Sequence, residues 1–337
     1  VPPRRSPHLI AGNYPIYLAA STVPADPRID VASGAHQFQT SVNLLSDTVV
    51  EVNGNATLIF NNELNLGGKT LTKTGDGTLS IRNDFATGGG TLLTVQGTIN
   101  GNGTVGGSVE NTGGTVAPGN SPGVLTIEGN YTQGSAATLA IEIAGTGAGT
   151  GHDQLDVNGS AGATLDGTLD ITTVGTYSPG VGAAPGEIGD TFKILTANSV
   201  NGTFATVNGN HIGSGKFYLT TYNSTDVTLG AFQALAGDAD GDKDVDVTDF
   251  NILANNFDPG GASGPHDWTT ADFDLDNDVD VTDFNDLANN FVPGGYGGVS
   301  GVVPEPTALI LLGLGIAGLA AAARRRQGVS NKSDRYS

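Results

Sequence analysis

Acidic side chains recur at fixed spacing in two stretches of the chain, residues 238–249 and 272–283. Oxygen ligands at positions 1, 3, 5, 9 and 12 of a twelve-residue loop, with a backbone carbonyl at position 7, are what encloses one calcium ion. Both stretches fit every one of these positions, so the spacing predicts two calcium sites. Their expected ligands are Asp238, Asp240, Asp242, Asp244, Asp246 and Asp249 in the first loop and Asp272, Asp274, Asp276, Asp278, Asp280 and Asp283 in the second.

A short amphipathic helix is expected after each loop, over residues 249–257 and 283–291. Apolar residues recur there at i, i+3, i+4 and i+7, which gives each helix one apolar face, and these faces are expected to pack on each other. The faces consist of Phe250, Leu253, Ala254 and Phe257, and of Phe284, Leu287, Ala288 and Phe291. Pro259 and Pro293 are expected to end the helices. Residues 235–237 leave too little chain for a helix before the first loop.

This duplicated loop and helix, with Asp at position 12, resembles the dockerin family, whose paired calcium-binding motifs hold two calcium ions and dock onto cohesin domains. The resemblance implies two calcium ions and a cohesin-like partner. Two features depart from the family pattern. Position 6 is usually Gly in this family but is Lys243 in the first loop and Asn277 in the second. Positions 10 and 11, which help many dockerins to recognise cohesin, are Val-Thr in both copies. An acidic, solvated linker is the alternative interpretation.

The composition excludes several classes of protein. The chain has no Cys, which rules out disulfides and thiolate-bound zinc. Of its formal net charge of −20, residues 237–291 contribute −14, because they hold fifteen Asp, no Glu and one Lys. Most of the acidity therefore belongs to the expected calcium loops, and nucleic acid is not an expected partner.

Short β-branched and aliphatic pieces between Gly and Asn turns fill residues 31–230 and indicate a mainly β fold, a parallel β-solenoid. At about 20 residues per turn, this stretch predicts about ten turns. Residues 71–81, 97–105 and 116–123 resemble the passenger repeats of autotransporter adhesins, which form right-handed β-helices. Longer, alternating segments from Thr191 to Leu229 predict a capping sheet at the end of the coil.

The C-terminal stretch combines Pro304-Glu305-Pro306, an uncharged run of 17 residues over 307–323, and Arg324, Arg325 and Arg326. As a transmembrane helix the run is about 25 Å long, against a hydrocarbon core of about 30 Å. This order of parts resembles the PEP-CTERM sorting signal, which an exosortase recognises and removes in bacterial envelopes. A permanent single-span membrane anchor is the alternative.

No catalytic constellation is apparent in residues 31–230. Asp166 and Asp170, on one expected strand, would lie about 13 Å apart, beyond the roughly 6.5–9.5 Å of an inverting glycosidase pair. Asp153 and Asp156 would face opposite sides of a strand. His36, His152 and His211 have no partner at motif spacing and are expected at the surface or in turns.

The expected organisation therefore comprises six parts: an irregular lead-in over 1–30, a solenoid stalk with its capping sheet over 31–230, the calcium-binding pair over 231–293, a Gly-rich linker over 294–303, the sorting signal over 304–326 and a polar tail over 327–337. Together the resemblances imply an exported, non-enzymatic structural or adhesion protein of a bacterial cell surface or matrix. An exosortase-type enzyme, transiently the inner membrane, and a cohesin-like protein or surface polysaccharide are the expected partners. A polysaccharide-degrading enzyme, or a docking subunit of a carbohydrate-degrading complex, is the alternative.

Overall fold

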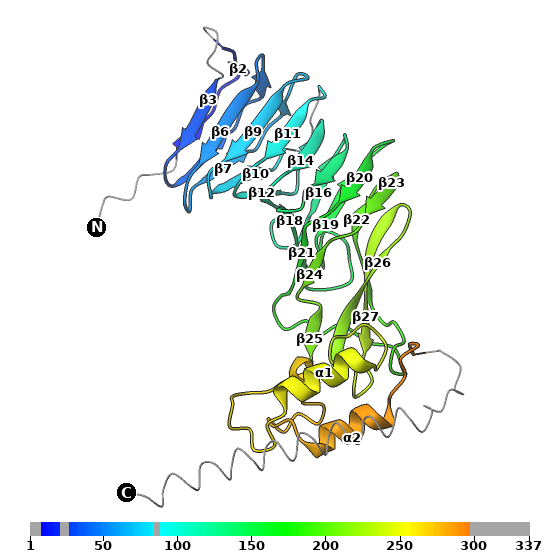
Figure 1. Cartoon of the computed structure of the whole chain (residues 1–337). Coiled ribbons are helices and arrows are strands. Elements are labelled where there is room, and N and C mark those ends of the chain that lie inside the picture. Colours follow the sequence, from blue (N-terminus) through cyan, green and yellow to red (C-terminus); the bar gives the residue numbers. More distant parts are fainter. Residues whose placement is uncertain (1–7, 21–26, 84–87, 297–337) are drawn as a thin grey trace, which may run out of the picture. The chain divides into compact units, whose positions relative to one another are not determined.

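The computed structural model describes residues 8–20, 27–83 and 88–296 (Figure 1). The chain divides into two units after Pro293, and the described residues up to that point lie in one compact unit. The division falls where the Gly-rich linker was expected to begin. The solenoid and the two acidic loops, which the sequence assigned to separate domains, lie in the same compact unit.

The described part of the solenoid is a coil whose strands pair in parallel with those of the next turn, and each full turn visits three sides in the same order. The first side is β1 His8–Ile10, β4 Ala35–Phe38, β7 Thr57–Phe60, β10 Thr78–Ile81, β12 Thr98–Gly101, β15 Thr115–Pro118, β18 Thr138–Ile143, β21 Thr168–Thr173 and β24 Thr206–Asn208. The second is β2 Ile16–Leu18, β5 Val42–Leu44 and β8 Leu64–Asn65, and later β13 Thr104–Val105, β16 Val124–Ile127, β19 Gln154–Val157 and β22 Thr191–Thr196. The third is β3 Arg28–Val31, β6 Thr48–Val52, β9 Thr70–Thr74, β11 Thr91–Thr94, β14 Ser108–Asn111, β17 Tyr131–Gln133, β20 Gly162–Leu165 and β23 Ser199–Gly202.

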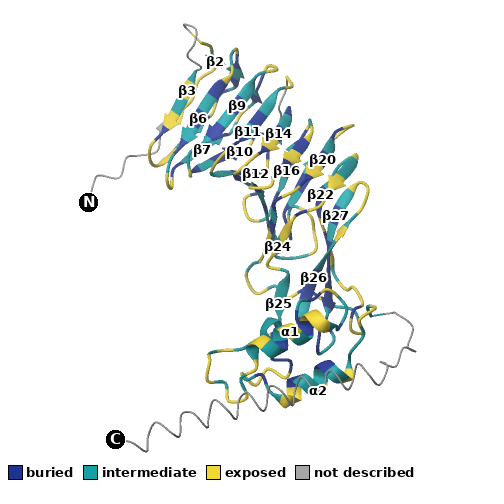
Figure 2. Ribbon diagram, in the orientation of Figure 1, coloured by how far each residue is buried: buried dark blue, intermediate teal, exposed yellow. Residues whose placement is uncertain are grey.

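The core forms because side chains alternate in and out along each strand and stack in register from turn to turn. On the first side Leu58, Leu79 and Ile99 occupy one inward row, and Val116 and Leu139 continue it. All five are at most 2% exposed. Figure 2 shows buried segments, in dark blue, on the strands of the coil. A coil of such short strands is stabilised by this continuous stack, since each turn covers the apolar face of its neighbour.

Threonine forms the matching outward row on the first side. The paired residues in this row are Thr57, Thr78, Thr98, Thr115, Thr138, Thr168 and Thr206. A β-branched side chain favours the extended backbone, and its hydroxyl can remain in contact with water on the outer face. This face of the solenoid is therefore regular and uncharged along the row.

The end of the coil is an antiparallel extension of the second side. Strand β22 pairs in parallel with β19 on one edge and antiparallel with β27 Asp226–Gln233 on the other, and β26 Lys216–Tyr222 and β25 His211–Gly213 follow outward. This sheet lies where the capping sheet was expected, with one difference in its strands. The segment expected as a strand over 203–207 instead contributes β24, which joins the parallel first side.

Two expectations about the solenoid are corrected. Residues 1–30 were expected to be irregular, yet β1, β2 and β3 begin there. Pro15 and Pro27 lie directly before β2 and β3 and not within them, so they do not interrupt the strand hydrogen bonds. The first-side strands within the described residues make eight turns rather than ten, because the turn length varies. It rises from 17 residues between Thr98 and Thr115 to 38 between Thr168 and Thr206.

The helical part of the described residues follows β27. It consists of α1 Val247–Asn256, the 3₁₀ helix η1 Trp268–Thr270 and α2 Val281–Asn289, and α1 packs against both other helices. Within the described ranges, no helix has the length and apolar character needed to cross a bilayer. The expected transmembrane helix over 307–323 lies outside the described residues.

Candidate calcium-binding site

The first acidic loop is shaped by hydrogen bonds from its own backbone. The two carboxylate oxygens of Asp238 accept the N–H groups of Gly241 and Lys243, at 2.7 and 3.2 Å. Asp249 accepts Ala239 N–H at 2.7 Å and Asp246 N–H at 2.8 Å, so its carboxylate joins the start and the end of the loop. Asp238 and Asp249 are at most 1% exposed. They are buried acidic groups, the kind that proteins hold only with compensating partners.

The second loop repeats this pattern with one difference: its first Asp accepts the N–H group of position 5, where Asp238 accepts that of position 4. Asp272 accepts the N–H groups of Asp276 and Asn277, and Asp283 accepts those of Phe273 and Asp280. Asp272 and Asp283 are 1% exposed. The 34-residue repeat in the sequence is therefore also a repeat of hydrogen-bonded loop structure.

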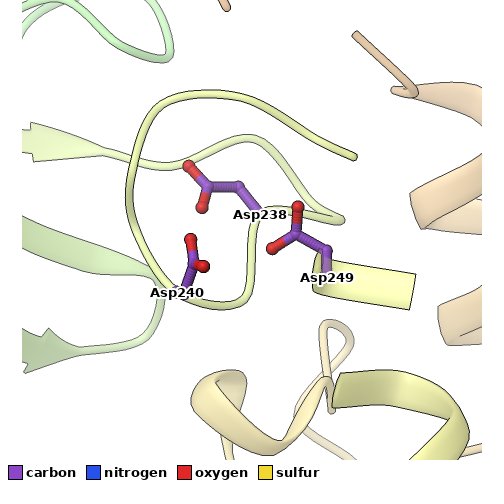
Figure 3. A group of neighbouring side chains, drawn as sticks. All are labelled: Asp238, Asp240 and Asp249. Atoms are coloured by element: carbon purple, nitrogen blue, oxygen red, sulfur yellow. The ribbon is translucent and has the colours of Figure 1, made fainter. Parts of the chain in front are cut away.

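Carboxylates converge in both loops. Side-chain oxygens of Asp238, Asp240 and Asp249 lie within 4.8 Å of one another, and the three groups point toward a common centre (Figure 3). The same spacing holds for three further sets: Asp244, Asp246 and Asp249; Asp272, Asp274 and Asp276; and Asp278, Asp280 and Asp283. Of the twelve predicted ligands, Asp242 alone belongs to none of these sets within the described residues.

Burial, and after it the crowding of like charges, raises the pKa of several of these carboxylates. Burial, together with the neighbouring Asp242 and Asp249, raises the pKa of Asp240 to about 6. Burial and neighbouring carboxylates also raise the pKa of Asp244 and Asp278. One oxygen each of Asp244 and Asp278 is buried without a hydrogen-bond partner. An all-oxygen set with unpartnered acceptors and mutual repulsion fits a hard divalent cation such as calcium.

The turn in each loop depends on left-handed backbone conformations. Position 6 has φ of 74° at Lys243 and 69° at Asn277, as the glycine usual there would. At position 4 the first loop has Gly241 with φ of 75°, whereas the second has Leu275 with φ of 61°. The Lys243 ammonium lies 5.4 Å from the centre of the Phe232 ring. Lys243 and Asn277 thus adopt the backbone conformation that glycine usually supplies at position 6. The second loop has one further strained residue, Leu275 at position 4.

Both helices begin two residues earlier than expected. Asp246 and Asp280 are their N-caps, each in a capping box with the Asp three residues later. The apolar faces agree in part with expectation, since Leu253 and Leu287 are buried. Phe257 was expected in this face but follows α1 as its C-cap and is 39% exposed.

Two short bridges join the repeats reciprocally. Val245 of the first loop pairs with Val292 after α2, and Asp258 after α1 pairs with Val279 of the second loop. Adding 34 to 245 and 258 gives 279 and 292, so the two bridges are equivalent under the repeat. Each loop is therefore tied to the end of the other repeat's helix, and the loops form one unit.

The first loop also rests on the antiparallel end of the solenoid, through residues that sequence reasoning did not single out. Trp268 donates its indole N–H to the carbonyl oxygen of Asp238 at 2.7 Å and is 6% exposed. A side chain at Gly241 would collide with the ring of Phe217 on β26, and one at Gly215 with Trp268. Trp268 is the one tryptophan of the chain, which was the available signal.

The solenoid residues considered for catalysis are scattered. Asp166 and Asp170 were expected on one strand, but Asp166 precedes β21 and only Asp170 lies within it. Asp156 accepts a hydrogen bond from Thr196 Oγ1. His36 lies 2.9 Å from the Ser33 carbonyl oxygen, and the ring of His211 packs on Phe217.

His152 was expected at the surface or in a turn but is 2% exposed, and Asp153 beside it is equally buried. They are buried because the segment after β18 folds back, placing the His152 ring 3.3 Å from the carbonyl oxygens of Gly145 and Lys193.

Comparison with known proteins identifies one segment. Residues 302–326 match the PEP-CTERM protein-sorting motif. The match contains Pro304, Glu305, Pro306, Arg324, Arg325 and Arg326, which all lie outside the described residues. A signal of this kind marks an exported, cell-surface protein and is processed by an exosortase, in agreement with the sequence-based prediction. No dockerin or autotransporter family matches, and no curated protein matches the chain.

Proposed function

We propose that this chain is a non-enzymatic structural or adhesion protein of the bacterial cell surface, in which a β-solenoid stalk carries a calcium-binding module. The observation that carries the proposal is the in-register threonine row along the first side of the solenoid. Such a repetitive outer face suits a spacer, because its length is set by the number of turns. The sorting motif supports display at the cell surface.

The module of loops and helices is proposed to bind two calcium ions, one in each loop. The ligands would be the side chains at positions 1, 3, 5, 9 and 12 and the backbone carbonyl at position 7. Buried Asp238, Asp249, Asp272 and Asp283 support this assignment, since a bound cation would neutralise groups that otherwise repel one another.

Trp268 allows the calcium proposal to be tested in the intact chain. Because its indole N–H contacts the first loop at the Asp238 carbonyl, adding calcium to EDTA-treated protein is expected to change tryptophan fluorescence. Calorimetry is expected to show two bound ions. Asp240→Asn and Asp274→Asn, at equivalent positions of the two loops, should each weaken one site. Absence of calcium binding at millimolar concentrations would refute the assignment.

The module is further proposed to dock onto a partner, a cohesin-like protein or a surface polysaccharide. Val247 and Val281, at position 10 of the two loops, are 60% and 56% exposed at the beginnings of α1 and α2. Exposed apolar side chains at equivalent positions favour a protein partner. Calcium-dependent capture by a cohesin domain, lost in Val247→Asp and in Val281→Asp, is the expected result.

A polysaccharide-degrading enzyme remains the second candidate because of one observation. Two acidic residues, Glu142 and Asp153, line the same cavity on the solenoid. Cleavage of a polysaccharide by the purified chain, abolished in Glu142→Gln, would establish the enzymatic function in place of the structural one.

A further inference from the structure

A cavity of about 370 Å³ lies where the first acidic loop meets the antiparallel end of the solenoid. Its lining comes from β26, from β24 and the residues just before it, from the turn after β24, and from positions 3 to 5 of the loop. The exposed Val247 and Val281 do not belong to this lining. The cavity is therefore a second surface of the module, distinct from the two valines.

Glycine at position 4 of the loop brings the two walls of the cavity together. Gly241 has φ of 75°, and a Cβ atom built on it would collide with the ring of Phe217 on β26. The loop backbone can therefore approach the strand closely. The carboxylates on either side of Gly241 reach the cavity from the loop, and the side chains of β26 reach it from the sheet.

An aromatic ring forms part of the sheet wall. Tyr222, at the end of β26, is half-buried and lines the cavity. Its hydroxyl oxygen accepts the Phe204 N–H at 3.2 Å, and the two rings lie 6.1 Å apart. Tyr222 is therefore held in place while part of it remains accessible. The face of an aromatic ring attracts cations and packs against C–H groups.

An accessible carboxylate forms part of the loop wall. Asp242 is exposed and belongs to none of the convergent carboxylate sets. Its Oδ1 accepts the Asp244 N–H at 3.0 Å, and its second oxygen accepts no hydrogen bond among the described residues. The half-buried Asp240 lies beside it in the lining. Even with one divalent ion bound, the loop would keep a formal charge of −3, because its six Asp outweigh the ion and Lys243.

Charge and size restrict the class of ligand. No Lys, Arg or His occurs in the lining among the described residues, so the two carboxylates favour a cationic ligand. The volume lies in the range of small-molecule sites and far exceeds that of one metal ion. A carboxylate opposite an aromatic ring suits an organic ammonium group, which can form an ion pair with one and a cation–π contact with the other.

Uncharged polar residues decide between two sources of such an ammonium group. Thr203, Asn210 and Thr220 also line the cavity, and each is exposed or half-buried. The stem of a lysine side chain has no polar group for them to contact. An amino sugar has hydroxyl groups beside its ammonium group, and apolar C–H groups that can pack on an aromatic ring. The lining therefore favours a sugar over a basic side chain of a protein.

We propose that this cavity binds one amino-sugar unit of a polysaccharide that carries free amino groups. Asp242 pairs with the ammonium group of the sugar, and Tyr222 contacts its ring. The site goes beyond the proposed stalk and calcium module and does not depend on a cohesin-like partner. Through it the end of the solenoid would hold a cationic polysaccharide.

The test compares two sugars that differ in charge. Saturation-transfer NMR uses the full chain in calcium, at a pH of about 6.5 so that amino groups are protonated, with the β-1,4-linked glucosamine tetramer and its N-acetylated counterpart. The glucosamine tetramer is expected to bind at millimolar concentration, and the acetylated tetramer at least tenfold more weakly. Added salt should weaken binding of the glucosamine tetramer, because its ion pair with Asp242 is exposed.

Substitutions locate the site. Asp242→Asn should lower the affinity about tenfold, the equivalent of about 1.4 kcal/mol. Because Asp242 is also a predicted calcium ligand, a second variant leaves the loop intact. Thr203→Lys places an ammonium group at an exposed position of the lining and should abolish binding, whereas the uncharged Thr203→Gln should retain it. Asp286→Asn removes a charge from α2, outside the lining, and should leave binding unchanged.

Three results would overturn the proposal: no binding of the glucosamine tetramer, equal binding of both tetramers, or binding that survives Thr203→Lys. A tetralysine peptide blocked at both ends should bind at least tenfold more weakly than the sugar. Equal or tighter binding of the peptide would identify a basic protein segment as the ligand instead. Thermal unfolding and the calcium response of Trp268 fluorescence are measured for each variant. A chain that binds the amino sugar but no calcium would refute the calcium proposal alone, and the reverse result would refute this one alone.

Discussion

A row of polar residues is buried inside the solenoid, where aliphatic side chains would be expected. Lys73, Thr94, Asn111 and Gln133 occupy consecutive positions in register on the third side, each at most 2% exposed. The Lys73 ammonium donates to the carbonyl oxygens of Thr74, Gly75 and Gln96, and the Gln133 amide donates to three others. Lys73, Asn111 and Gln133 thus satisfy backbone carbonyls, whereas Thr94 Oγ1 is buried without a hydrogen-bond partner among the described residues.

Lys73 provides a test of this interpretation through pH. Burial lowers the pKa of Lys73 from 10.5 to about 8, against the opposing effect of Asp76. Between these values the unfolded chain binds more protons than the folded chain, so the free energy of unfolding should rise from pH 8 to 10.5. Lys73→Met should remove this rise and cost about 1–3 kcal/mol at neutral pH, because three carbonyls lose their donor. Urea unfolding across this pH range, with the same substitution at Lys69 as control, measures both effects.

Leu275 is the residue at which the second loop should gain most from glycine. Its φ of 61° places a branched side chain in the left-handed region, at a cost of about 1–2 kcal/mol. Leu275→Gly is expected to tighten calcium binding at the second loop by about five- to thirtyfold, the equivalent of this cost. Leu275→Ala keeps the strained Cβ and serves as the control. Calorimetric affinities equal in the glycine and alanine variants would contradict the argument.

At the scale of elements, the first loop is held between the 3₁₀ helix η1 and the antiparallel strands at the end of the solenoid. The second loop does not have this pair of contacts among the described residues. Trp268 in η1 donates to the Asp238 carbonyl, while Phe217 and Phe232 of the antiparallel strands contact Gly241 and Lys243. The solenoid end therefore supports the loop conformation that would bind calcium. Ligand geometry set by surrounding packing is the usual way in which a protein pre-organises a site.

Trp268→Phe should weaken the first calcium site selectively. The substitution keeps an aromatic ring against Gly215 but leaves the Asp238 carbonyl without its donor, a loss of about 1 kcal/mol, or roughly fivefold in affinity. Calorimetry should show the second site unchanged. Equal weakening of both sites would indicate that the reciprocal bridges, rather than Trp268, control the first loop.

At the scale of the whole molecule, the chain combines a repetitive stalk, a proposed ion-binding end and a signal for export. The regular threonine row extends over most of the first side, and the loops lie beside the antiparallel end of the same compact unit. The stalk and the proposed calcium module therefore share one compact unit.

The C-terminal segment is expected to be absent from the mature protein in its native host. Because Pro304 and Pro306 disfavour helix on both sides of Glu305, the sequence favours cleavage at this motif by a processing enzyme. Glu305→Ala should yield an uncleaved, membrane-bound form. Intact-mass spectrometry of surface-extracted protein measures the outcome, and a mature chain that retains Arg324, Arg325 and Arg326 would identify a plain anchor instead.

Local patterns in the sequence were sufficient for the strands, the two acidic loops and the sorting motif. The period of the apolar residues predicts the parallel coil, and the spacing of twelve aspartates predicts two loops, because a strand, a loop or a short signal depends on residues close in the chain. For the same reason the start of the coil was misplaced: the prolines in residues 1–30 suggested irregular chain, whereas the ladder with β4, β5 and β6 orders β1, β2 and β3.

Only the tertiary structure determined which distant residues meet. The contact of Trp268 with Asp238 spans 30 residues, the bridges of Val245 and Asp258 cross between the repeats, and Asn100 shares a cavity with Glu142 two strands away. Turn lengths between 17 and 38 residues set these neighbours, and no local pattern encodes them. In a coil, the length of each loop between strands decides which side chains of neighbouring turns lie next to each other. The cavity, and the contact of the first acidic loop with the end of the solenoid, can therefore be recognised only in the tertiary structure.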